Sequence, residues 1–200
     1  MYPDCIRNLI EAFKFFPGIG DKTAERLAFS VLNLENEQVD FFLKSLSDVS
    51  INIHPCPICN TITDKDVCAI CSDNLRKSNI LCVVEDSKSV FLFEKLGMFS
   101  GLYHVLDGLI SPLDGINPED IGLSKLFDRI QNGNFKEIIF AFRPNIEGET
   151  TSLYISKLLE KYDVVVSRIA LGIPMGADID YVDSLTLEMA LENRKIISSN

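Results

Sequence analysis

Four cysteines in two C-x-x-C pairs constrain the fold of this 200-residue chain more than any other feature. The pairs are Cys56 with Cys59 and Cys68 with Cys71, so four thiols fall within a segment too short to form its own hydrophobic core. Zn²⁺ prefers four such ligands in a tetrahedron, and two tight turns supply them. We therefore predict one structural zinc ion per chain, with no open position for a reacting water.

The alternatives for these cysteines are two disulfides or four unrelated buried thiols. Residues Met1 to Asp4 lack the basic and then apolar pattern of a secretory signal, so we expect a cytosolic protein with reduced thiols, which favours zinc. No apolar run of the sequence reaches the length of a membrane span. His54 could also offer a ligand, but four thiolates already complete the set. Cys5 and Cys82 are expected to pack as small apolar residues.

The formal net charge of −10 limits the kinds of nucleic-acid binding open to this chain. A protein that coats nucleic acid with its whole surface is normally basic. Any contact with nucleic acid must therefore come from a local basic cluster, from several copies of the chain acting together, or with the help of a partner protein.

The first 53 residues predict three helices and a glycine turn. Apolar residues at helical spacing indicate one helix over residues 4–15 and another within residues 36–47. Between them, Pro17 ends the first helix, Gly18 and Gly20 allow a tight turn, and Asp21 is expected to be the N-cap of the second helix. We expect the second and third helices to bury apolar side chains, namely Ala24, Leu27, Ala28, Val31 and Leu32 in the second and Val39, Phe42, Leu43 and Leu46 in the third.

This order of helix, turn and helix is typical of a helix-hairpin-helix unit. The turn can present backbone N–H groups at a helix N-terminus, where a phosphate can bind. Lys22 and Arg26 lie four residues apart on one face of that helix, so both could contact a phosphate backbone without reading bases. The alternative is a plain helical hairpin in which the glycines only make the turn and the two basic side chains are solvated.

The rest of the chain alternates strands with helices, which predicts a parallel α/β unit. Strands are expected at residues 80–85, 102–106, 137–142 and 164–169, helices at residues 87–96, 118–131 and 150–162, and a short hairpin at residues 60–66. In parallel sheets, functional residues gather at the C-terminal ends of the strands. Glu85 lies at one such end, and residues 143–149 follow another.

The chain resembles the RecR family of bacterial recombination mediators over nearly all of its length. The resemblance rests on an ordered series of motifs: residues 16–20 with Lys22 and Arg26, the four cysteines, and residues 83–85, 101–108, 147–151, 168–174 and 186–187. It implies a helix-hairpin-helix region at residues 1–53, a four-cysteine zinc finger at 54–78, a Toprim domain at 79–175 and a C-terminal tail at 176–200. It further implies a homotetrameric ring that clamps DNA without sequence preference and works with RecO and RecF. On the basis of this resemblance, Lys22 and Arg26 are expected to contact DNA.

The Toprim resemblance raises the question of catalysis. Toprim topoisomerases and primases carry a glutamate at a strand end and then an acidic D-x-D pair that holds Mg²⁺. Glu85 matches the first acid, but Arg143-Pro144-Asn145 stands where the pair is expected, and asparagine is usual at position 143 in the RecR family. An arginine there places a fixed positive charge at the metal position, so two-metal phosphoryl chemistry is not expected.

Three further residues invite functional interpretations. Glu147 and Glu149, with Glu85, could bind a cation or a basic patch of a partner protein. The alternative for Glu147 and Glu149 is an acidic first turn of the following helix, which the helix dipole favours. His104 is expected to be a hydrogen-bonded structural residue within its strand.

The resemblance to the RecR family, together with the missing acidic pair, implies a non-enzymatic DNA-repair clamp that helps load recombinase onto single-stranded DNA. Its expected location is the bacterial cytoplasm, on the nucleoid when active. The main alternative is a divergent Toprim nuclease or primase-like enzyme. A structural adaptor that binds only proteins is a third hypothesis.

Overall fold

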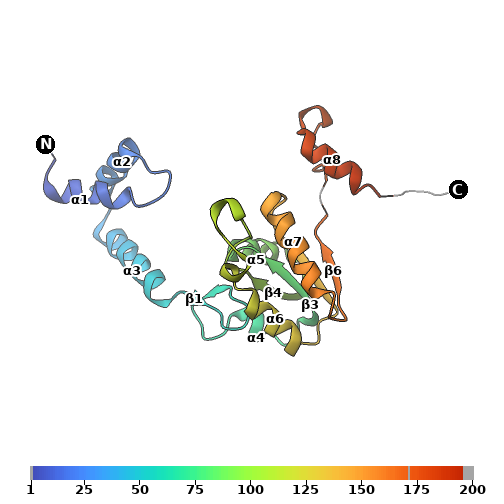
Figure 1. Ribbon diagram of the computed structural model, residues 1–200. Coiled ribbons are helices and arrows are strands. Elements are labelled where there is room, and N and C mark those ends of the chain that lie inside the picture. Colours follow the sequence, from blue (N-terminus) through green and yellow to red (C-terminus); the bar gives the residue numbers. More distant parts are fainter. Residues whose placement is uncertain (1, 171, 196–200) are drawn as a thin grey trace. The chain divides into compact units, whose positions relative to one another are not determined.

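The computed structural model describes residues 2–170 and 172–195 (Figure 1). These residues form two compact units, which divide between Ile53 and His54. Within the two described ranges, every helix is too short or too polar to span a bilayer. Residues 196–200 of the predicted C-terminal tail, and residue 171 within one of the family motifs, lie outside the described residues.

The N-terminal unit consists of α1 (Asp4–Phe13), α2 (Asp21–Val31) and α3 (Asn36–Asn52). α1 and α2 pack against each other around a small core in which Ile6 of α1 and Ala24 and Ala28 of α2 are buried. The two alanines lie one helical turn apart, so they leave room for the backbones of the two helices to come close. The predicted pair of helices joined by a glycine turn is present.

Several expectations for this unit are wrong in detail. The N-cap of α2 is Gly20, whose carbonyl accepts the N–H of Ala24 at 2.9 Å. Asp21 is the first helical residue, and its carboxylate pairs with Lys14 at 2.9 Å. Leu32, which lies beyond the end of α2, is 65% exposed.

The third helix also departs from expectation. α3 buries none of its residues, and Phe42, Leu43 and Leu46 are all exposed. The reason is that α1 and α2 form their core with each other, whereas α3 makes few contacts with either.

The cysteine-rich segment begins the second unit. It contains β1 (His54–Pro55), β2 (Ile62–Thr63) and the single-turn helix α4 (Ala69–Ser72). β1 and β2 pair antiparallel, with His54 opposite Thr63. The hairpin therefore encloses the first cysteine pair, instead of lying at residues 60–66 between the two pairs as expected.

The α/β part contains one parallel sheet of four strands, which are β3 (Lys77–Val84), β4 (Gly101–Val105), β5 (Glu137–Ala141) and β6 (Val165–Arg168). Their order across the sheet is β4-β3-β5-β6, and every neighbouring pair is parallel. α5 (Ser87–Leu96) connects β3 to β4, α6 (Leu123–Asn132) precedes β5, and α7 (Ile146–Leu159) connects β5 to β6. The predicted parallel α/β fold is therefore confirmed.

Residues of the central strand β3 alternate between the two faces of the sheet, as the period of a strand requires. Leu81 and Val83 join a core that includes buried residues of α6 and α7. Cys82 and Val84 join a smaller core on the opposite face, together with Val90 of α5. Both faces of β3 are thus covered, which explains why its sequence reads as a continuous apolar run.

Two predicted helices have different boundaries. The helix expected at residues 118–131 consists of the 3₁₀ turn η2 (Pro118–Ile121) and α6, which meet at Gly122 with φ of +70°. α7 begins at Ile146 and not at residue 150, because the side chain of Asn145 accepts a hydrogen bond from the N–H of Gly148 at 2.9 Å. The other elements of the described chain are η1 (Pro112–Asp114), η3 (Ile179–Tyr181) and α8 (Ser184–Glu192).

Candidate functional site

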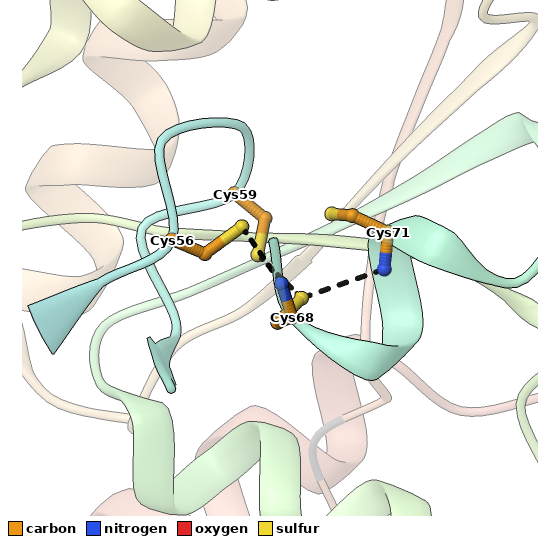
Figure 2. Close-up of side chains that lie close together, drawn as sticks. All are labelled: Cys56, Cys59, Cys68 and Cys71. Carbon is orange, nitrogen blue, oxygen red and sulfur yellow. Dashed lines mark hydrogen bonds between the residues drawn. The ribbon is translucent and has the colours of Figure 1, made fainter. Parts of the chain in front are cut away.

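The four cysteines of the two C-x-x-C pairs meet in one cluster (Figure 2). Their Sγ atoms all lie within 4.8 Å of one another. A tetrahedron with zinc–sulfur bonds of about 2.3 Å has edges of about 3.8 Å, so small side-chain rotations bring the sulfurs to the distances of a zinc site. Cys56, Cys59 and Cys68 are buried and Cys71 is partly buried. The residues present therefore fit one structural zinc ion.

Backbone N–H groups stabilise the negative charge that thiolates carry in this cluster. The N–H of Cys68 points at Sγ of Cys56, at 3.5 Å, and the N–H of Cys71 at Sγ of Cys68, at 3.4 Å (Figure 2). A hydrogen bond from Cys71 lowers the pKa of the Cys59 thiol to about 4, whereas burial raises the pKa of Cys68 to about 11. Zinc holds its cysteine ligands as thiolates, so zinc binding releases the protons that remain.

The first cysteine pair is attached directly to the edge of the sheet. The carbonyl of Cys59 accepts the N–H of Val105, in β4, at 2.8 Å. The side-chain amide of Asn60 donates to the carbonyl of Val105 at 3.1 Å and to Oδ1 of Asp107 at 2.7 Å. Asn60 itself has φ of 64°, a left-handed conformation that asparagine tolerates better than most residues. Sequence reasoning did not single out Asn60 or Asp107, because their contact joins segments far apart in the chain.

Of the remaining cysteines and histidines, Cys82 and His104 are buried, whereas Cys5 and His54 are exposed. Cys82 is buried as expected, and burial raises the pKa of its thiol to about 12. Cys5 is exposed, so the expectation that it packs as an apolar residue is wrong. His104 is 2% exposed and lies 3.4 Å from the guanidinium of Arg129, and burial lowers its pKa to about 3. His54 lies on β1, outside the four-sulfur cluster.

The turn before α2 has the conformation that the helix-hairpin-helix interpretation requires. Gly18 has φ of +81°, and the N–H of Ile19 donates to the carbonyl of Phe16 at 3.1 Å, which closes a tight turn. Lys22 and Arg26 lie on α2 and are both exposed. The first N–H groups of a helix have no partner within that helix, and such groups are donors of the kind that can bind a phosphate.

The acidic residue at the end of β3 lies beside the arginine that follows β5. Because β3 and β5 are parallel neighbours, their C-terminal ends bring Glu85 and Arg143 together. Nε of Arg143 lies 2.9 and 3.0 Å from the two carboxylate oxygens of Glu85. The hydrogen bond with Glu85 raises the pKa of the Arg143 guanidinium. The strand-end acid that matches the Toprim pattern is therefore already paired with an internal cation.

The other two acids of this region are placed by the first turn of α7. Glu149 forms an ion pair with Arg168, which lies at the end of β6. Glu147 lies in the same helical turn and contributes to the raised pKa of Arg143. Gly148 lets this turn approach the loop before it, since a Cβ there would lie 2.1 Å from the carbonyl oxygen of Arg143. Two arginines thus lie among the acids, and the pairing with Arg168 was not anticipated from the sequence.

The fold and these sites define a class of protein in which a helix-hairpin-helix unit and a four-cysteine zinc finger precede a Toprim-type α/β domain. Family models agree with this class and match in chain order. They are the RecR helix-hairpin-helix over residues 6–49, the RecR four-cysteine zinc finger domain over 53–73, the Toprim domain over 79–170 and the RecR C-terminal region over 172–195.

A curated relative identifies the family. The chain is 46% identical over 194 residues to "Recombination protein RecR" of Natranaerobius thermophilus, and the match covers 97% of this chain and 98% of that protein. The chain belongs to the RecR family. The predictions of a four-cysteine zinc finger and of zinc as its metal are confirmed by the family model and by the geometry of the four thiols.

Proposed function

We propose that this chain is a non-enzymatic DNA-binding clamp in recombinational repair. In this proposal it acts in the bacterial cytoplasm with RecO and RecF and helps load recombinase onto single-stranded DNA. Membership of the RecR family and the name of its relative support the role in recombination. The helix-hairpin-helix unit supports a DNA contact through Lys22 and Arg26, which reaches phosphates and carries no base information.

The observation that carries the non-enzymatic part of the proposal is the pairing of Arg143 with Glu85. A catalytic Mg²⁺ needs a cluster of carboxylates that is free to coordinate it. Here both oxygens of Glu85 lie within 3.0 Å of a guanidinium nitrogen. A divalent cation would have to displace that guanidinium, and Pro144 and Asn145 supply no carboxylate in its place.

If this interpretation is correct, replacing Glu85 removes no catalytic activity. We expect wild type and Glu85→Ala to give the same background in plasmid-nicking and primer-synthesis assays with Mg²⁺ or Mn²⁺. Glu119→Ala, which removes an exposed glutamate from a different part of the domain, is the matched control. Metal-dependent cleavage that persists in wild type and Glu119→Ala but vanishes in Glu85→Ala would show that the site is enzymatic.

Assembly into a homotetrameric ring is also part of the proposal, and α3 supports it. Its apolar residues follow one another at spacings of three and four, the pattern of a helix that packs on another helix. They are Val39, Phe42, Leu46 and Val49, and Ile53 continues the spacing just beyond the end of the helix. All of these except Val39 are exposed in the single chain. Association of copies through this stripe would cover the apolar side chains. It would also let several small basic clusters act on one DNA despite the net charge of −10.

A charge placed in this stripe should therefore dissociate the assembly without unfolding the chain. We expect Leu46→Glu to reduce the molar mass in light scattering to that of a smaller species, because the side chain is exposed in the isolated unit but covered in the assembly. Ser47→Glu adds the same charge one position away, outside the stripe, and should leave the mass unchanged. An unchanged mass for Leu46→Glu would place the interface on another surface.

We propose that a basic surface of a partner protein binds to the acidic residues Glu85, Glu147 and Glu149. Their position at the C-terminal edge of the sheet supports this role, although Arg143 and Arg168 neutralise part of the charge.

We also propose that the chain is organised in four regions: the helix-hairpin-helix region, the zinc finger, the Toprim domain and the C-terminal tail. Their boundaries lie after residues 53, 78 and 175.

A further inference from the structure

A cavity of about 870 Å³ lies between the first cysteine pair, the edge strand β4 and α6. Its volume is in the range of pockets that bind small organic molecules. Its lining comes from three places: the zinc finger between Pro55 and Asn60, Leu102 and His104 of β4, and α6 with the loop that follows it. The hydrogen bonds of Cys59 and Asn60 to Val105 join the first two of these parts to each other.

Two cations on α6 line this cavity without an acidic partner. Lys125 and Arg129 lie one helical turn apart, and neither forms an ion pair within the described residues. Arg76, Arg143 and Arg168 of the same unit each pair with a glutamate. The guanidinium of Arg129 is partly buried and lies over the ring of Phe135, 5.9 Å from its centre, but it has no carboxylate partner among the described residues. An anion in the cavity would supply a charged partner.

The position of Arg129 is fixed by the sheet edge. Its Nη1 donates to the carbonyl of Tyr103 at 2.5 Å and lies 3.4 Å from Nδ1 of His104. Nη2 and Nε have no hydrogen-bond partner among the described residues, so they remain available to a ligand. A guanidinium held in this way keeps its planar pair of donors in one orientation, which suits a phosphate.

The rest of the lining suits a flat, partly apolar group with polar edges. Pro57, Ile58 and Phe135 form apolar surface, while Asn132 and Asn134 offer amide donors and acceptors. Apart from Cys56, which belongs to the zinc site, the charged lining residues are Lys125, Arg129 and Asp128, so basic side chains outnumber acidic ones there in a chain whose net charge is −10. A phosphate joined to an aromatic ring satisfies both parts of this lining.

We propose that this cavity is a nucleotide site, in which Lys125 and Arg129 bind a phosphate and the base packs against the apolar wall. The nucleotide is either a free nucleoside monophosphate or one residue of a single DNA strand. This site is distinct from the proposed DNA contact of Lys22 and Arg26, which lies in the other unit.

Equilibrium dialysis of the zinc-loaded, full-length protein with labelled dAMP tests the site. We expect one dAMP per chain, and weaker binding of deoxyadenosine and of inorganic phosphate, because each fills only part of the cavity. Lys125→Glu should reduce dAMP affinity at least about tenfold, since it replaces one charge-assisted contact by repulsion. Lys157→Glu makes the same charge change at an exposed position of α7 that does not line the cavity, and should bind as wild type.

Two further measurements identify the source of the nucleotide and distinguish this site from the proposed DNA contact of Lys22 and Arg26. Displacement of dAMP by a fifteen-residue oligothymidylate assigns the cavity to a DNA strand, and no displacement assigns it to free nucleotide. A Lys22→Ala, Arg26→Ala double mutant should bind dAMP as wild type, whatever its affinity for duplex DNA. Absence of dAMP binding, or equal binding by Lys125→Glu and wild type with zinc content unchanged, overturns the proposal.

Discussion

Replacing Cys59 by serine is expected to abolish zinc retention and to unfold the segment around the four cysteines. In isolated zinc-finger peptides, structural zinc contributes roughly 10–16 kcal/mol of binding free energy, which is also folding free energy. The segment has little core besides the cysteines themselves, because the cluster of buried residues there consists of Cys56, Cys59 and Cys68. Elemental analysis of the Cys59→Ser protein should therefore find almost no zinc.

The structure extends this prediction beyond the metal. The carbonyl of Cys59 and the side chain of Asn60 hold the end of β4, so loss of zinc should increase hydrogen exchange at the N–H of Val105. Cys5→Ser replaces an exposed cysteine outside the cluster and should change neither zinc content nor exchange. Full zinc occupancy in Cys59→Ser would mean that the four thiols do not act as one site.

The double substitution Lys22→Ala, Arg26→Ala is expected to remove most of the salt dependence of DNA binding. Each phosphate contact contributes about −0.9 to the slope of log K against log salt concentration. In the proposed tetramer the two positions supply up to about eight contacts, so the slope should fall by up to about 7. Binding should weaken equally for all DNA sequences, because phosphate contacts do not read bases.

The control for this experiment removes the same charge from the same unit. Arg7 and Lys44 are exposed on α1 and α3, so Arg7→Ala, Lys44→Ala lowers the charge equally but leaves the turn before α2 untouched. Both double mutants should keep their zinc, their molar mass and nearly their full stability, since all four side chains are exposed. An unchanged salt slope for Lys22→Ala, Arg26→Ala would place the DNA contact on another surface.

Residue patterns predicted best the helices and strands that short stretches of sequence determine by themselves. Strands and helices of the α/β part were expected near their observed positions because β-branched and apolar runs alternate with helical spacing over short stretches. Boundaries were missed where one side-chain contact or one glycine decides them. Asn145 starts α7 four residues early, and Gly122 interrupts the helix expected at residues 118–131.

Exposure was predicted less well than secondary structure. The spacing of apolar residues in α3 predicts a buried face, yet Phe42 and Leu46 are exposed in the single chain. Periodicity shows that a helix has an apolar face, but it does not show whether the same chain or another copy covers that face. The exposed stripe is therefore informative about assembly, which the pattern alone does not address.

The zinc finger follows from residue spacing alone, because all four ligands lie between residues 56 and 71 and short-range spacing controls their geometry. The parallel α/β class likewise follows from the alternation of strands and helices along the chain. Three features could be seen only in the tertiary structure. Arg143 pairs with Glu85, 58 residues away, and the first cysteine pair is hydrogen-bonded to the end of β4. The third is the cavity that Arg129 lines without a carboxylate partner. The physical reason is that these contacts depend on the order and register of the strands. Strand order and register bring distant residues together, and no spacing along the chain records them.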